Sequence, residues 1–231
     1  MGIIRKIAVA ITRKIGLYKW AVNVETKFSN KKKQHYFKKY GLEALIQVDQ
    51  AFRSVNSFIF LDFGTLLGAY RDKNFIAHDC DIDVGYLHDT APENMPELLK
   101  SYGFEHKLQF YVKETGLIVE DRYIYKGVQV DFFPHFRSGT RFYCYLGRQH
   151  ETKPPEEANR TDGFPCKLSW VDADDFSEYD FLGQKFFVPN NTSKWLESVY
   201  GASYMTPIKT KYEDTHIVKA HSERIYRRYF K

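Results

Sequence analysis

Cysteine is scarce in this sequence, and the cysteines that are present do not form a recognisable set. Cys80, Cys144 and Cys166 are far apart in the 231 residues, and no two of them have a C-x-x-C spacing. This pattern excludes the common zinc motifs and a disulfide framework, and it is typical of a reducing compartment. We do not expect Cys80 to act as a nucleophile, because the neighbouring Asp79 and Asp81 would raise the pKa of its thiol.

Long apolar runs are also absent. No segment of the sequence approaches the ~20 consecutive apolar residues that a membrane-spanning helix needs. The apolar stretch 7–12 (IAVAIT) follows two basic residues, as in a signal peptide, but it is too short. Arg13 and Lys14 interrupt it where a cleavage site would lie. We therefore expect a cytoplasmic protein.

Acidic residues are nearly missing from positions 1–40. Eleven Lys and Arg residues stand there beside one acid, Glu25, whereas the whole chain has a net charge of +5, so the remainder is net acidic. Isoleucine recurs at every fourth position from 3 to 15, which predicts a helix with one apolar stripe. This basic amphipathic helix could lie on an anionic membrane through residues 1–20, or it could pack on the protein body or on a partner.

The rest of the pattern predicts a mixed α/β (α+β) domain with one central sheet flanked by helices. Residues 25–35 are polar and are interpreted as a linker, which divides the chain into an arm with its linker, 1–35, and a domain, 36–231. The polar stretch 150–165 predicts a mobile loop, and the tail from Glu213 predicts a basic helix. We expect helices at 36–55, 65–72, 92–102 and 193–200, and strands at 57–63, 81–86, 104–113, 117–125, 127–133, 140–147 and 181–189.

The segment Asp62–Tyr86, DFGTLLGAYRDKNFIAHDCDIDVGY, is the most informative part of the sequence. An apolar strand ends here at Gly64 and Thr65 and a helix begins, so free backbone N–H groups and the helix dipole favour a phosphate. Gly64 would let the phosphate approach the backbone, and Thr65 would add a hydroxyl donor. Arg71, on the helix, could reach the same phosphate with its planar guanidinium.

Three aspartates in two apolar strands indicate a metal site. Asp81 and Asp83 alternate in DIDVGY, so both carboxylates face one side of a strand, about 7 Å apart. Two such carboxylates repel each other without a cation between them, and a site with few carboxylates and room for phosphate oxygens suits Mg²⁺. A solvated acidic edge is the alternative for this pair alone. Asp131 favours the metal site, because an unpaired carboxylate inside the apolar strand GVQVDFF would be costly.

These motifs resemble the signature of the LicD and fukutin-related phosphotransferases. That signature reads GTLLGAxR followed by FIPWDDDID, and GTLLGAYRDKNFIAHDCDIDVG is similar to it. VDFFPHF is similar to the third-aspartate strand of the family, and VPNNTSKWLESVYGASYMTP is similar to its C-terminal pattern. The three motifs occur in order over about residues 36–210. The resemblance implies a polymerase-beta-like nucleotidyltransferase fold.

The resemblance also implies a role for each matching residue. Asp81, Asp83 and Asp131 would bind Mg²⁺, or Mn²⁺, and carry catalysis. Asp131 would either complete the metal site or accept the proton of the acceptor hydroxyl. Donor phosphates would be bound by Gly64, Thr65 and Arg71, and Asp79 would shape the site.

The sequence departs from the signature just before the aspartates. Ala77 and His78 replace the usual Pro-Trp, and Cys80 replaces the middle acid. His78 is interpreted either as a contact to donor or acceptor or as a loop histidine at the solvent edge, and His135 as a structural histidine. The family tail has Tyr200, Gly201 and Tyr204 in matching positions, with packing or acceptor contact as their expected roles.

The predicted function is transfer of a phospho-alcohol from a CDP-linked donor to a hydroxyl of a cell-surface glycan. CDP-choline, CDP-ribitol and CDP-glycerol are the donor classes that the resemblance implies, and a lipid-linked acceptor would place the enzyme on the inner face of the membrane. The departures at residues 77–80 motivate one alternative, a degenerate member that binds glycan or scaffolds a synthesis complex. A second alternative is nucleotidyl transfer to RNA or protein. Because the body is acidic and no RNA-binding module is recognisable, we expect no nucleic-acid partner. The donor alcohol, the acceptor sugar and the oligomeric state stay open.

Overall fold

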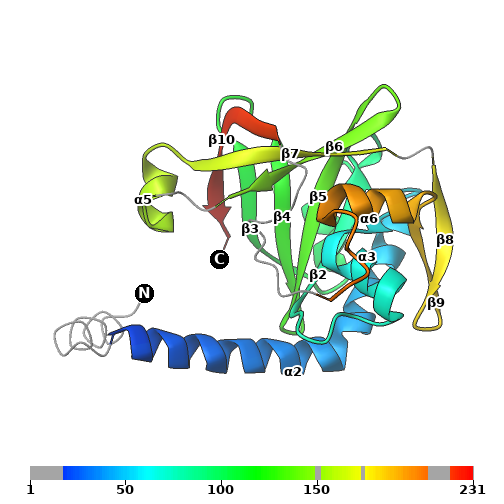
Figure 1. The fold of residues 1–231 in the computed structure, drawn as a ribbon, viewed down its shortest axis with the longest axis horizontal. Helices are drawn as coiled ribbons and strands as arrows, with labels where there is room; N and C mark the ends of the chain where they lie inside the picture. The colour runs from blue at the N-terminus through cyan, green and yellow to red at the C-terminus, as the bar shows by residue number, and fades with distance from the viewer. Residues whose placement is uncertain (1–17, 149–151, 173–174, 208–218, 231) are drawn as a thin grey trace.

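A ten-stranded mixed sheet forms the centre of the fold (Figure 1). The computed structural model describes residues 18–148, 152–172, 175–207 and 219–230. The strand order is β4-β3-β10-β7-β6-β5-β2-β1-β9-β8. Strands β2 and β5 are parallel, as are β1 and β9, and the other paired strands are antiparallel. The expected mixed α/β class with a central mixed sheet and helices is confirmed.

The elements follow the predicted order in the first half of the chain. The helices are α2 (Tyr18–Arg53), α3 (Phe63–Leu67), the π-helical turn η1 (Gly68–Asp72), the 3₁₀ turn η2 (His88–Thr90), α4 (Met95–Ser101), α5 (Pro155–Arg160) and α6 (Thr192–Tyr200). The strands are β1 (Phe60–Leu61), β2 (Asp81–Leu87), β3 (Glu105–Val112), β4 (Ile118–Tyr125), β5 (Val128–Ser138), β6 (Arg141–Gly147), β7 (Phe164–Asp172), β8 (Phe176–Phe181), β9 (Gln184–Pro189) and β10 (Lys219–Tyr229).

Six of the strands close into a ring. Strand β5 pairs with β4 over Val128–Phe132 and then, farther along, with β6 over Phe136–Ser138. The remaining ring contacts run from β4 through β3, β10 and β7 to β6. Strand β2 lies beside β5 outside this ring. A small core of its own, which includes Phe110, Phe164 and Ile225, packs the ring strands against α5.

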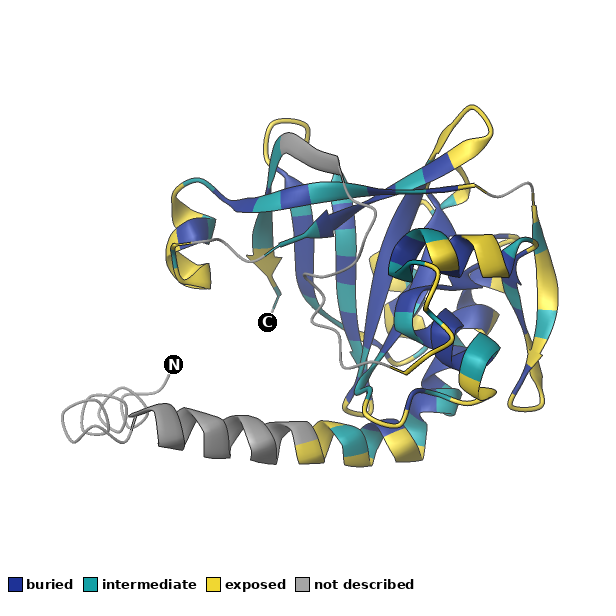
Figure 2. Cartoon of the chain, in the orientation of Figure 1, coloured by how far each residue is buried: buried dark blue, intermediate teal, exposed yellow. Residues whose placement is uncertain are grey.

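The larger core joins the helices to β1, β2 and β5. The second half of α2 buries Leu45, Val48 and Phe52 against the sheet, and the ring of Phe52 stacks on that of Phe132 with centroids 6.1 Å apart. Trp195 of α6 is fully buried and meets Phe60 edge-to-face at 5.6 Å. Figure 2 shows the buried residues along the central strands and on the sides of the helices that face them. This packing fixes β2, β5 and α3 relative to one another.

Two expectations about polar segments are wrong. The expected linker 25–35 is part of α2, which continues without a break through positions 35 and 36, where the arm was expected to meet the domain (Figure 1). Lysine, glutamate and glutamine are good helix formers, but a segment that is polar on all sides shows no apolar period. The expected loop 150–165 contains α5 and the start of β7. The apolar stripe at residues 3–15 lies outside the described residues.

The expected basic helix at the C-terminus is also wrong. Residues Lys219–Tyr229 form β10, which lies between β3 and β7 and pairs with both. Each of these neighbours would otherwise leave a row of backbone N–H and C=O groups unpaired at the ring. The requirement comes from strands that are distant in sequence, β3 (Glu105–Val112) and β7 (Phe164–Asp172), so local propensity could not reveal it.

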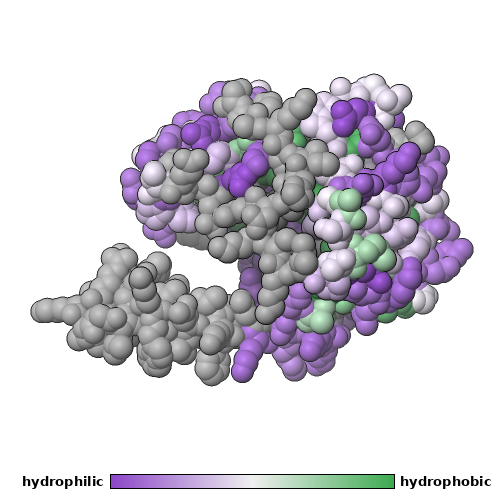
Figure 3. All heavy atoms as spheres, in the orientation of Figure 1, coloured by the Kyte–Doolittle hydropathy of each residue, from purple (hydrophilic) through white to green (hydrophobic). Residues whose placement is uncertain are grey.

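The visible surface is mainly hydrophilic, with small separate apolar areas (Figure 3). The exposed large apolar side chains of the described residues are scattered: Val55, Leu182, Met205 and Tyr229. In the described part of the chain, none of the helices combines the length and the apolar composition required to cross a bilayer.

Candidate active site

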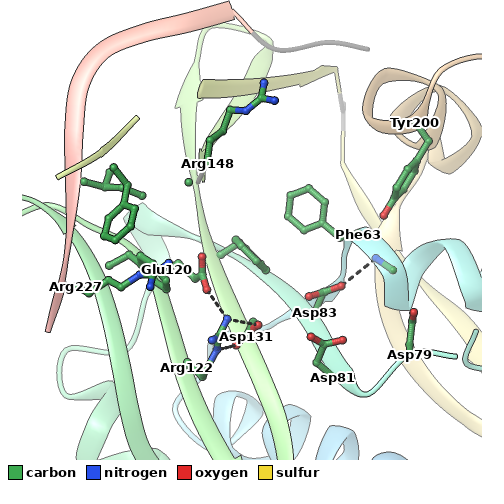
Figure 4. A pocket seen from close by; sticks show the side chains of 16 residues that line it. Phe63, Asp79, Asp81, Asp83, Glu120, Arg122, Asp131, Arg148, Tyr200 and Arg227 are labelled. Atoms are coloured by element: carbon green, nitrogen blue, oxygen red, sulfur yellow. Dashed lines mark hydrogen bonds and ion pairs between the residues drawn. The ribbon is translucent and has the colours of Figure 1, made fainter. Parts of the chain in front are cut away.

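A pocket of about 410 Å³ lies between the β2–α3 region and one wall of the ring. The β2 side contributes Asp79, Asp81 and Asp83, together with Phe63 and Gly64 of α3. The ring side contributes Asp131 of β5, Glu120 and Arg122 of β4, Arg148 after β6, and Arg227 of β10. Figure 4 shows the aspartates of the β2 side on one flank of the pocket and Arg227 with Glu120 on the other. Carboxylates and guanidinium groups therefore meet across a single cavity.

The register of β2 and β5 brings the three predicted aspartates together. Asp83 is paired with Asp131 in adjacent parallel strands, and Asp81 is paired with Gln129. Adjacent strands lie about 4.8 Å apart, and residues two apart in one strand share a face. All three carboxylates consequently line the same pocket. Among the residues that the structure describes, however, no three His, Cys, Asp or Glu side chains approach one another closely enough to hold a metal ion.

Mutual repulsion and burial act on the acids of the β2 side. Burial raises the pKa of Asp83 well above its usual value, and the charges of Asp81 and Asp131 add to this. The pKa of Asp81 is raised by burial and then by Asp131. Burial and the nearby Asp81 raise the pKa of Asp79 to about 6. These shifts have the direction expected for carboxylates that lack a compensating cation.

Asp131 is neutralised by an arginine that the sequence analysis did not identify. Arg122 donates from Nε to Oδ1 of Asp131 at 2.7 Å and from Nη2 to Oδ2 at 3.0 Å. Gln129 donates to the same Oδ2 at 2.9 Å and also reaches Oδ2 of Asp81 at 3.3 Å. Since only 4% of Asp131 is exposed, its two oxygens are largely committed to these donors.

Glu120 shares the same guanidinium. Nη2 of Arg122 donates to Oε1 of Glu120 at 3.0 Å, two residues earlier on the same face of β4. Burial and the charge of Asp131 raise the pKa of Glu120 to about 8, and these effects exceed the opposite effects of Arg122 and Arg227. The spacing of Glu120 and Arg122 on one face of a predicted strand was the available sequence signal for this pair.

Gly64 brings the start of α3 against the acids. Its backbone N–H donates to Oδ2 of Asp83 at 3.0 Å. A Cβ at this position would lie 3.0 Å from Oδ2 of Asp79 and 3.1 Å from Oδ2 of Asp83, so a side chain would crowd both carboxylates. Thr65 lies deeper: its hydroxyl accepts a hydrogen bond from the backbone N–H of Asp83 at 2.9 Å, and it is not part of the pocket lining. Together these two residues hold α3 against β2.

Arg71 and His78 lie away from the pocket lining. Arg71 donates from Nε and Nη2 to the carboxylate of Asp72 at 2.7 and 2.8 Å. The side chain of His78 is 81% exposed and lies 3.9 Å from Asp79. Their expected contacts to donor or acceptor stay predictions. Cys80 is not part of the lining either.

The residues of the family tail differ in position. Tyr200 lines the pocket from the end of α6, and Gly201 ends that helix with a positive φ of 82°. The hydroxyl of Tyr204 lies 2.8 Å from that of Ser193, outside the lining. His135 is buried and hydrogen-bonded to Asp62 at 2.7 Å, in agreement with its interpretation as a structural histidine.

Carboxylates that face guanidinium groups across one cavity could bind a ligand that carries both a cation and phosphate. A scan against protein families matches residues 56–191 to the family described as LicD/FKTN/FKRP, nucleotidyltransferase domain. The chain belongs to this family, and the resemblance noted in the sequence is confirmed. Membership suggests a transferase with a phosphotransferase-type function in glycan modification. A search of curated proteins finds no match.

Proposed function

We propose that this protein transfers a phospho-alcohol from a CDP-linked donor to a hydroxyl of a cell-surface glycan, with Mg²⁺ as its metal, on a nucleotidyltransferase-like fold. The observation that carries the proposal is the pairing of Asp83 with Asp131, with Asp81 on the same face, in one pocket. Buried carboxylates that raise one another's pKa need a positive partner, and a divalent metal ion would be one.

The donor set fits Mg²⁺ in part. Mg²⁺ is commonly bound through one or two carboxylates, with the remaining positions taken by water and substrate phosphates. Asp81 and Asp83 fit this pattern, and Mn²⁺ would accept the same oxygens. When bound, the metal would neutralise charge on the donor phosphates. Five carboxylates and three guanidinium groups line the pocket, so the lining has an excess of negative charge that one divalent cation would offset.

The other residues would position the groups that react. The missing side chain of Gly64 would leave room for the donor phosphates beside Asp79 and Asp83, while its N–H holds Asp83 in place. Because both oxygens of Asp131 accept hydrogen bonds, we assign this residue to positioning of Arg122 and Gln129 and not to proton acceptance. Phosphoryl transfer depends mainly on such positioning and charge neutralisation.

One observation favours a second candidate, a non-catalytic family member that binds glycan. Arg122 occupies the carboxylate of Asp131, which was expected to be the third metal ligand, and Cys80 replaces an acid of the family signature. A protein of this kind would retain the fold and the pocket without holding a nucleotide-linked donor. Donor binding separates the two candidates.

The test is a thermal-shift panel with Mg²⁺ and CDP-choline, CDP-ribitol, CDP-glycerol, CTP or a UDP-sugar. A ligand at 100 times its dissociation constant stabilises by about 2.7 kcal/mol, or about 5–10 °C for a chain of this size. We expect one CDP-alcohol to raise Tm in a magnesium-dependent way, and Asp83→Asn to abolish this rise. Asp89→Asn is the matched control, because Asp89 is exposed and lies outside the pocket.

A donor that shifts Tm is then incubated with a glycan acceptor, and release of CMP is measured. Magnesium-dependent release that Asp83→Asn reduces at least 100-fold would support the phosphotransferase. If the folded wild-type protein responds to no nucleotide, the non-catalytic candidate replaces it.

A further inference from the structure

The ring wall of the pocket carries positive charge opposite the aspartates. Arg227 of β10 and Arg148 after β6 both line this wall. Figure 4 shows Arg227 and Asp79 on opposite sides of the pocket, with the Asp131–Arg122 pair between them. Opposite charges are therefore separated along the cavity, which suits a ligand with more than one charged group.

The guanidinium of Arg227 is held by packing. Its Cζ lies 4.1 Å from the ring centroid of Phe164 and 5.1 Å from that of Phe110, both of which also line the pocket. Aromatic faces attract a guanidinium and limit its rotation. The side chain is consequently restrained before any ligand binds.

The backbone of Arg227 is fixed as well. Asn159 of α5 accepts a hydrogen bond from the N–H of Arg227 at 2.5 Å and donates to its C=O at 3.0 Å. Strand β10 also pairs with β3, and in this pairing Arg227 lies opposite Phe110. The position of Arg227 thus depends on α5 and on the ring, and not on the aspartates of β2.

One donor of this restrained group has no acceptor. Nε of Arg227 is buried and has no hydrogen-bond partner among the residues that the structure describes. The charge of Arg227 lowers the pKa of Glu120, but Glu120 accepts its hydrogen bond from Arg122. A buried guanidinium N–H without an acceptor is unfavourable, and such groups in native structures call for a partner. An oxygen of a bound phosphate would supply it.

We propose that Arg227 forms an anion subsite, with Arg148 on the same wall, that binds a phosphate group of the ligand across the pocket from Asp81 and Asp83. A guanidinium is suited to phosphate because its N–H groups match the spacing of two oxygens. The subsite deepens the proposed function, since a CDP-linked donor contains two linked phosphates. One phosphate would lie near the aspartates with Mg²⁺, and the other would reach Arg227.

Calorimetric titration with magnesium pyrophosphate tests the subsite without a nucleotide. We expect the wild-type protein to bind it, and Arg227→Gln to bind it at least 10-fold more weakly. Arg228→Gln is the matched control: Arg228 is the next residue of β10, is exposed and donates to Gln109 outside the pocket, so its binding should change less than 2-fold. Arg227→Lys keeps the charge but removes Nε, and an intermediate loss is expected.

Three results would overturn the subsite: no binding by the wild type, equal binding by Arg227→Gln, or an equal loss in Arg228→Gln. If Arg227→Gln does not fold, the comparison of Arg227→Lys with Arg228→Lys decides in the same way. The same titrations with CDP-alcohols separate this inference from the proposed function. Pyrophosphate binding that depends on Arg227, without binding of any CDP-alcohol, would keep the subsite and reject the donor class. Binding of a CDP-alcohol that needs Asp83 but not Arg227 would keep the donor class and reject the subsite.

Discussion

Arg122 determines how charge is distributed among the residues of the pocket. Its guanidinium is shared by the carboxylates of Asp131 and Glu120, which together carry one more charge than it can balance. Asp131 receives two hydrogen bonds from it, and Glu120 receives one. In a buried site the remaining negative charge is unfavourable, and a proton on Glu120 removes it. This accounts for the rise of the Glu120 pKa to about 8.

Glu120 therefore makes stability depend on pH. Below about pH 8 the folded protein keeps a proton on Glu120, whereas the unfolded chain releases it above the usual value of 4.5. The folded state binds more protons in this window, so this contribution to the free energy of unfolding falls as pH rises from about 5 to 8. The Glu120→Gln variant has no titrating group at this position. We expect its Tm, relative to that of the wild type, to rise over the same window without divalent cations.

Thermal unfolding at pH 5, 6, 7 and 8 measures this difference. Glu93→Gln, at an exposed position before α4, is the control and should follow the wild type at every pH. A constant difference between Glu120→Gln and the wild type would show that Glu120 does not take up the proton.

The sequence predicts which face a side chain occupies where the alternation of residues in a strand determines it. Alternation in DIDVGY placed Asp81 and Asp83 on one face, and the register of β2 with β5 sets Asp131 opposite Asp83. The partner of Asp131 could not be predicted in this way. Arg122 reaches it because β4 and β5 are antiparallel with Arg122 opposite Asp131, and this register depends on the turn between them.

At the scale of elements, Asp62 fixes the start of α3. It is fully buried, and its carboxylate accepts hydrogen bonds from the N–H of Phe63 at 2.9 Å and from Nε1 of Trp195 at 3.1 Å. Its other oxygen is bonded to Nε2 of His135 at 2.7 Å. One side chain thus connects α3, α6 and β5 directly behind the backbone N–H of Gly64.

We expect Asp62→Ala to be strongly destabilising. It removes the cap of α3 and leaves the donors of Trp195 and His135 buried without their acceptor, which together should lower the free energy of unfolding by about 3–5 kcal/mol. Denaturation in urea measures the loss. Asn94→Ala is the matched control, because Asn94 precedes α4 but makes no side-chain cap bond, and its cost should be below about 0.5 kcal/mol. A cost below 1 kcal/mol for Asp62→Ala would contradict this role.

Helices and strands could be predicted where the pattern of their own residues determines the structure. They were less predictable where pairing with distant strands determines it. The predicted helix 36–55 has a clear apolar period, and the matching part of α2 packs on the sheet through Leu45, Val48 and Phe52. In contrast, the residues of β10 include many helix formers, and only the free edges of β3 and β7 make them a strand. The position of Arg227 across the pocket from the aspartates could not be predicted either, because Arg227 lies in β10, which was expected to be a helix.

At the scale of the whole molecule, the ring and the β2–α3 region supply opposite sides of the pocket. Strand β5 belongs to both, since it pairs with β2 on one edge and with β4 and β6 on the other. A displacement of β5 would change the distance between the two halves. The two hydrophobic cores on either side of this strand therefore hold the aspartates and the arginines in one geometry.

The first residue of α2 with a described place in the core is Phe37, whereas most of the basic residues of positions 1–40 precede it. We propose that residues 1–20 hold the protein on an anionic membrane, near a lipid-linked acceptor. Each Lys or Arg close to such a surface contributes about 1 kcal/mol, and salt weakens the attraction.

Deletion of residues 1–30 should then separate membrane binding from folding and from chemistry. We expect the shortened protein to keep a Tm within about 3 °C of the full chain, because the core residues from Phe37 onward remain. The shortened protein should no longer sediment with vesicles that contain anionic lipid. The full chain should sediment with them at low salt and be released at high salt. Neutral vesicles are the control, and neither protein should bind them strongly.

Transfer to a soluble acceptor should be retained, since the pocket residues all lie after position 62. Equal sedimentation of both proteins would place the membrane contact elsewhere, whereas a large fall in Tm would mean that the helix before Phe37 contributes to the fold.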